Sequence, residues 1–77
     1  MRMSEHHLYL KAFGDNLRRI RKEQHLTMES LAFLSQIDYR QIGRIERGEI
    51  NTTILSVYRI AQSLHIEIYL LFLFKQN

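Results

Sequence analysis

The feature that most constrains this chain is the absence of cysteine from a sequence of only 77 residues. A chain this short forms one domain, and its hydrophobic core lies near the lower limit for independent stability. Disulfides, a metal ion or a partner chain usually stabilise domains of this size. Because disulfides and thiolate-bound zinc are excluded, we expect a single domain over residues 1–77 that is stabilised by a second copy of itself.

Hydrophobic periodicity and capping residues predict an all-α domain of four or five short helices. The first helix is expected from Glu5 or Leu8 to about Gln24, after an N-terminal arm over residues 1–7. Its apolar side chains recur at helical spacing and are Leu10, Phe13, Leu17 and Ile20. Three further helices follow residues that favour N-caps: Thr27 precedes residues 28–34, Asp38 precedes residues 39–47 and Thr53 precedes residues 54–64.

The last apolar segment, residues 66–74, can be read as a helix or as a strand. β-Branched and aromatic residues dominate it and its periodicity is poor, so both remain open, and we favour a short helix followed by an extended tail. One alternative is that Leu71 and Phe74 cap the core and the other side chains are isolated surface residues. We instead expect residues 66–77 to form a homodimer interface. With two residues of the preceding helix, the expected interface comprises Tyr58, Gln62, Tyr69, Leu70, Phe72, Leu73 and Phe74.

The helices expected over residues 28–34 and 39–47 are very short and are joined by about four residues. Their apolar side chains are spaced to pack the pair at a steep angle, and these are Leu31, Ala32, Ile37, Ile42 and Ile45. This arrangement is typical of a helix-turn-helix, whose second helix can enter the major groove of double-stranded DNA. The outer face of that second helix is expected to carry Tyr39, Arg40, Gly43, Arg44 and Arg47. Arginine can donate two hydrogen bonds to guanine, and a glycine permits close backbone approach.

Net charge agrees with an anionic partner. Eleven Lys and Arg against eight Asp and Glu give a formal charge of +3. A modest excess of this kind favours nucleic acid or another anionic surface as the partner.

A set of residues spread along the chain resembles a known family. The set comprises residues 13–21, Leu26, Thr27, Leu31, Ala32, Ile42, residues 45–48, Asn51, Ile60, Ala61, Leu64 and Ile66. Together they resemble the XRE family of helix-turn-helix proteins, the Cro and phage-repressor type, over roughly residues 13–72. The most specific part is Glu46-Arg47-Gly48 at the end of the second short helix. Leu31-Ala32-Phe33 and the shortness of the chain are also similar to restriction–modification controller proteins.

The resemblance implies a compact, lambda-repressor-like domain with assigned roles for individual residues. Tyr39, Arg40 and Arg44 match its base-reading positions. Its phosphate-contacting positions correspond to Thr27, Met28, Gln41, Arg47, Asn51 and Thr52. A helix N-terminus such as that at Thr27 is an anion site on physical grounds as well. Arg21 and Glu46 match a pair that forms a structural salt bridge behind the recognition helix.

The chain departs from the family pattern at several positions. His25, Gln36 and His65 stand where the family usually has glycine, so these residues are expected in left-handed backbone geometry, at a cost of about 1 kcal/mol each. Met28 stands where glutamine is usual, which removes one side-chain contact to DNA.

The function implied is a sequence-specific transcriptional regulator that reads a palindromic operator as a homodimer. The alternative is an antitoxin-like interaction module whose C-terminal apolar segment binds a partner protein. We expect no enzyme, cofactor or small-molecule ligand, because no catalytic or phosphate-binding motif is present. His6-His7 lacks the i, i+4 spacing of a helical ligand pair, so no metal site is expected. The longest uncharged apolar stretch, residues 68–74, is too short to span a membrane, and a cytoplasmic location is expected.

Overall fold

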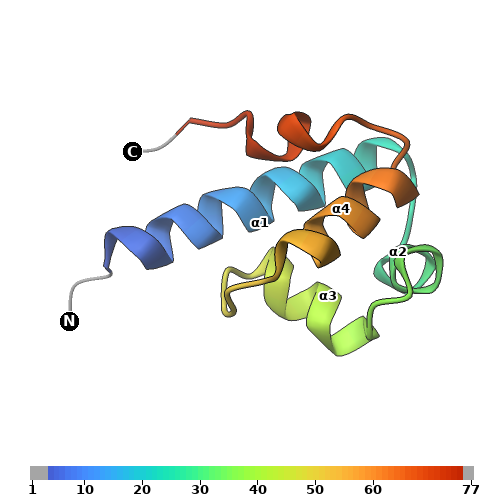
Figure 1. The fold of residues 1–77 in the computed structure, drawn as a ribbon, viewed down its shortest axis with the longest axis horizontal. Helices are drawn as coiled ribbons and strands as arrows, with labels where there is room; N and C mark the ends of the chain where they lie inside the picture. Colours follow the sequence, from blue (N-terminus) through green and yellow to red (C-terminus); the bar gives the residue numbers. More distant parts are fainter. Residues whose placement is uncertain (1–3, 76–77) are drawn as a thin grey trace.

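The computed structural model describes residues 4–75 and consists of α-helices, one 3₁₀-helix and their connections. The elements are α1 (Glu5–Glu23), α2 (Met28–Ser35), α3 (Tyr39–Glu46), α4 (Ile54–Ser63) and the 3₁₀-helix η1 (Ile68–Phe72). In Figure 1, α1 runs along the length of the molecule, with α2, α3 and α4 to one side and the C-terminal segment folded back along the other. No strand occurs between residues 4 and 75, so the predicted all-α fold is confirmed.

Helix starts follow from side-chain caps that satisfy free backbone N–H groups. The Oγ atoms of Thr27 and Thr53 accept hydrogen bonds from the backbone N–H groups three residues later, at 3.0 and 3.1 Å. Asp38 accepts from the N–H of Arg40 at 2.7 Å. All three predicted caps are therefore confirmed, and the predicted ends of the three helices are right to within one residue.

The prediction of an N-terminal arm over residues 1–7 is wrong for residues 5–7, which are helical. Ser4 caps α1 by accepting from the N–H of His7 at 3.0 Å, so residues 5–7 already belong to the helix. A polar cap with an acidic residue in the following turn stabilises a helix start here. Residues 1–3 of the arm lie outside the described residues, as do residues 76 and 77 of the C-terminal segment.

The core draws its buried side chains from all five elements. Those that are almost completely inaccessible to solvent are Leu17, Leu31, Ile42, Ile60, Leu64 and Leu71. Helices of eight to ten residues such as α2, α3 and α4 are not stable alone. Their stability therefore depends on the apolar face that each packs against α1 and against one another.

The four α-helices end in the same hydrogen-bonded turn, the Schellman motif. In each turn, a residue in left-handed geometry is followed by a residue whose N–H donates to a carbonyl five residues earlier. The left-handed residues are His25 (φ 60°), Gln36 (φ 57°), Gly48 (φ 71°) and His65 (φ 55°). The left-handed geometry predicted for the three non-glycine positions is therefore confirmed.

The helix α3 approaches α1 at two glycines. A Cβ atom on Gly14 would fall on the carbonyl oxygens of Ile45 and Glu46, and one on Gly48 would lie 2.6 Å from the Cα of Lys11. The C-terminal end of α3 therefore rests on the backbone of α1. This contact fixes the direction in which the short helix points.

The C-terminal segment packs against α1 as a 3₁₀-helix followed by a non-helical tail, as the favoured interpretation predicted. Asn16, which is buried, donates to the carbonyl oxygens of Leu70 and Leu71 at 3.0 and 2.9 Å. The ring of Phe72 lies 5.0 Å from that of Phe13 between centroids. Leu71 is fully buried, so this segment completes the core of the chain itself.

Replacing Gly14 by alanine should lower stability, because the added methyl group meets backbone atoms that cannot move independently. We expect a loss of about 1–3 kcal/mol, measured by urea denaturation. Gly43→Ala is the matched control, since its Cβ would meet only the flexible side chain of Arg47 at 3.0 Å. That change should be neutral or stabilising by up to about 1 kcal/mol. Equal losses in both variants would contradict the proposed close approach.

Candidate nucleic-acid interface

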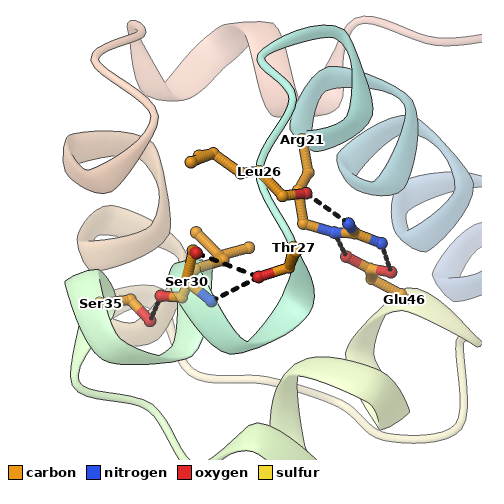
Figure 2. A network of polar contacts seen from close by, with 7 residues as sticks. Arg21, Leu26, Thr27, Ser30, Ser35 and Glu46 are labelled. Atoms are coloured by element: carbon orange, nitrogen blue, oxygen red, sulfur yellow. Dashed lines mark hydrogen bonds and ion pairs between the residues drawn. The ribbon is translucent and has the colours of Figure 1, made fainter.

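The start of α2 presents a capped helix N-terminus. Figure 2 shows Thr27 at the beginning of α2 with its Oγ turned toward Ser30, from whose backbone N–H it accepts a 3.0 Å hydrogen bond. Thr27 is exposed, whereas the side chain of Met28 packs against the core. Of Met28, only the backbone is therefore placed to meet a phosphate, and the helix dipole favours an anion there.

The outer face of α3 is polar and cationic. Tyr39, Arg40, Gln41, Arg44 and Arg47 are all exposed, whereas Ile42 and Ile45 point into the core. The arginines at positions 40 and 44 are one helical turn apart and therefore project from the same face. In the connection to α4, Asn51 is exposed and Thr52 is half-buried.

Gly43 was expected on the open outer face of α3, and this prediction is wrong. It is buried, and a Cβ atom built on it would lie 3.0 Å from Nη1 of Arg47. The Arg47 side chain thus folds back over Gly43, one turn earlier in α3. Sequence position alone could not reveal this cover, because it depends on the rotamer of a long side chain.

A buried ion pair supports α3 from behind. Nε of Arg21 lies 2.7 Å from Oε2 of Glu46 and Nη2 lies 3.0 Å from Oε1, while Nη1 donates to the carbonyl oxygen of Leu26 at 2.7 Å (Figure 2). The two charged residues are only 6% and 5% exposed. The hydrogen bond to Glu46 raises the pKa of Arg21 despite burial, so the guanidinium remains charged. The pair joins α1, the turn before α2 and the end of α3.

A second arginine–glutamate pair lies on the exposed side of α3. Nε of Arg47 is 2.6 Å from Oε2 of Glu49, and Nη2 is 3.3 Å from Oε1. The hydrogen bond to Arg47 lowers the pKa of Glu49, and that to Glu49 raises the pKa of Arg47. Both groups are therefore charged at neutral pH. Glu49 was not among the site residues predicted from the sequence, in which its only signal is its position two residues after Arg47.

The expected dimer interface is divided between exposed and internally packed side chains. Tyr69 and Leu73 are 63% and 67% exposed, and Tyr58 is also exposed. Gln62 is exposed and donates to the hydroxyl of Tyr58 at 2.9 Å. The remaining three residues also contact the chain itself. Leu70 is half-buried, Phe74 is half-buried with its ring 5.2 Å from that of Tyr9, and Phe72 packs on Phe13 but is still 42% exposed.

Comparison with known proteins relates the chain to helix-turn-helix proteins. The family model HTH_3, described as helix-turn-helix, matches residues 17–71. Over 61 residues, covering 75% of this chain and 79% of the relative, the sequence is 34% identical to the uncharacterized HTH-type transcriptional regulator y4dJ of Sinorhizobium fredii.

Solved structures agree with this relationship. The restriction-modification controller protein C.AhdI from Aeromonas hydrophila is similar with a TM-score of 0.81 and 40% identity, over 82% of this chain and 96% of that one. The controller protein C.Esp1396I is similar with a TM-score of 0.76 and 33% identity, over 83% of each chain. Between residues 4 and 75, no helix has both the length and the apolar character needed to cross a membrane.

Replacing Glu46 by alanine should strongly destabilise the domain, because Arg21 would keep a buried charge without its partner. The expected loss is about 3–5 kcal/mol in the free energy of unfolding, measured by chemical denaturation. Asp15→Ala, which breaks the exposed Lys11–Asp15 pair in α1, should cost less than about 1 kcal/mol. A small loss in Glu46→Ala would show that the buried pair does not hold α3 in place.

Proposed function

This chain belongs to the helix-turn-helix family HTH_3, and we propose that it is a sequence-specific transcriptional regulator that binds a palindromic DNA operator as a homodimer. The XRE-type family and the similarity to controller proteins, both predicted from the sequence, are confirmed by the matches. The names of the relatives support the proposal, since one is called a transcriptional regulator and two are restriction-modification controller proteins.

The observation that carries the proposal is the two-sided construction of α3. One side is buried through Ile42 and Ile45 and is held by Glu46, while the other exposes Arg40 and Arg44. A helix supported in this way can enter a major groove without losing its own packing. Arginine is the side chain best suited to guanine there, because it donates two parallel hydrogen bonds to O6 and N7. Tyr39, at the start of the same helix, completes the proposed base-reading set.

Phosphate contacts would orient α3 in the groove. Thr27 and the backbone N–H of Met28 stand at the N-terminus of α2, and Gln41, Asn51 and Thr52 are exposed or half-buried around α3. Hydroxyl, amide and backbone N–H groups are common partners of phosphate oxygens. Arg47 completes this set if its side chain leaves Glu49.

The homodimer would use the apolar side chains that the C-terminal segment leaves exposed, above all Tyr69 and Leu73, together with Tyr58 and Gln62 of α4. Large exposed apolar side chains gathered on one segment of a short chain favour an interface. Two copies would place their α3 helices in successive major grooves, about 34–36 Å apart.

Selection of bound sequences from random DNA, followed by titration of the selected duplex, tests base reading. Arg40→Ala and Arg44→Ala should each weaken binding to the selected duplex by about 1–3 kcal/mol and relax the preference at one base position in each half-site. Asn51→Ala should weaken binding to selected and scrambled duplexes alike. Equal effects of the arginine changes on both duplexes, or selection that yields no preferred sequence, would contradict the proposal.

The dimer is tested by the oligomeric state at micromolar concentration, measured by sedimentation equilibrium. Leu73→Glu should convert the dimer to a monomer, because it places a charge in the proposed apolar contact. Phe33→Glu is the matched control, since Phe33 is another highly exposed apolar residue, 82% exposed compared with 67% for Leu73, and lies on α2, outside the proposed interface.

Dissociation by Phe33→Glu alone would move the interface to α2. A wild-type chain that remains monomeric would contradict the dimer. It would favour instead the antitoxin-like alternative, in which the C-terminal segment covers another protein.

A further inference from the structure

The turn after α3 differs from the other three helix ends in its last residue. After α1, α2 and α4, the residue that follows the left-handed position is Leu26, Ile37 or Ile66, and each packs against the core. Such an apolar contact usually accompanies this turn. After α3 the corresponding residue is Glu49, and its side chain is exposed. The same backbone motif therefore directs a carboxylate to the surface where the other turns direct an apolar group inward.

That carboxylate is held against the recognition helix. The backbone N–H of Glu49 donates to the carbonyl oxygen of Arg44 at 2.9 Å, which fixes the stem of the side chain. Both carboxylate oxygens contact the guanidinium of Arg47, at 2.6 and 3.3 Å. The guanidinium is thereby kept over Gly43, in the middle of α3.

The pair changes the charge that α3 offers to DNA. Within residues 4–75, Arg40 and Arg44 take part in no ion pair, whereas Arg47 is neutralised by Glu49. An arginine that neutralises a phosphate releases a counterion from DNA, and this release drives much of the affinity. Arg47 can contribute in this way only after Glu49 has been displaced, and the displaced carboxylate then faces the phosphate backbone.

We propose that Glu49 is an internal counter-ion that competes with DNA phosphate for Arg47 and so lowers the affinity of the chain for every duplex. This inference rests on the proposed DNA-binding function. Because the pair is exposed and its two charges are screened by solvent, the effect is a moderate adjustment of affinity and not an obligatory switch.

The chain provides a matched control for the loss of one negative charge. Arg19 and Glu23 of α1 form another exposed pair, with Nη1 and Oε2 2.9 Å apart, outside the proposed interface. Their side chains are 56% and 62% exposed, compared with 58% and 45% for Arg47 and Glu49. Glu23→Gln therefore raises the net charge by the same amount without freeing Arg47.

The test is the affinity of the full chain for a selected duplex and for a scrambled duplex of equal length, measured by fluorescence anisotropy over a series of NaCl concentrations. Glu49→Gln should tighten binding to both duplexes by about two- to fivefold for each recognition helix engaged. The slope of log affinity against log salt should steepen by about 0.9 for each freed arginine. Glu23→Gln should produce less than half of either change.

A second pair of variants isolates the role of Arg47. In an Arg47→Ala background, Glu49→Gln should tighten binding less than it does in the wild type, because only the repulsion between the carboxylate and phosphate and its attraction to Arg44 then remain. Circular dichroism and thermal unfolding verify that each variant is folded, which is expected because both pairs are exposed.

Two outcomes would overturn the inference while DNA binding itself stands: equal effects of Glu49→Gln and Glu23→Gln, or weaker binding by Glu49→Gln, which would mean that Glu49 orients Arg47 toward phosphate. Absence of binding by the wild type and every variant to any duplex would overturn the proposed function and this inference with it.

Discussion

The rest of the structure depends on the buried ion pair between Arg21 and Glu46. It joins the end of the long helix α1 to the last residue of α3, and the third nitrogen of Arg21 binds the carbonyl oxygen of Leu26. A buried charge pair is tolerated only when its hydrogen-bonding groups are satisfied, and the bidentate geometry meets that condition. With Gly14 allowing the two backbones to touch, the pair fixes the position of a helix only eight residues long.

Support from behind explains how α3 can expose so much charge. A helix of this length has no stability of its own, and a face of arginines adds repulsion. Because apolar packing and Glu46 hold its inner face, the side chains of its outer face are not needed for stability and are available for binding. The exposed Arg47–Glu49 pair then changes the charge that this outer face carries. The two glutamates near the end of α3 thus act on opposite sides: one holds the helix, and the other neutralises an arginine.

Most local features could be predicted because short-range physics determines them. Thr27, Asp38 and Thr53 are caps by virtue of their side-chain oxygens. The left-handed positions were expected from the family resemblance, because the family usually has glycine there. The features that the sequence did not reveal depend on distant or flexible groups. The cover of Gly43 by Arg47 is a rotamer choice, and the ring contacts of Phe72 and Phe74 with α1 join residues far apart in the chain. Asn16, which anchors the tail, contacts residues more than fifty positions away.

The sequence by itself determined the helices, their caps and the helix-turn-helix, because periodicity, side-chain oxygens and spacing act within a few residues. The family was identified separately, from a resemblance spread over roughly residues 13–72. The family resemblance already implied the pairing of Arg21 with Glu46, whereas only the tertiary structure decided that Glu49 pairs with Arg47. Arg21, Arg44 and Arg47 are the same residue type, yet one is buried against Glu46, one is exposed without an ion pair among residues 4–75, and one is neutralised by Glu49. Their differences arise from the close contact of α1 with α3 and from the turn that follows, and electrostatic strength depends on those distances and on exposure to water.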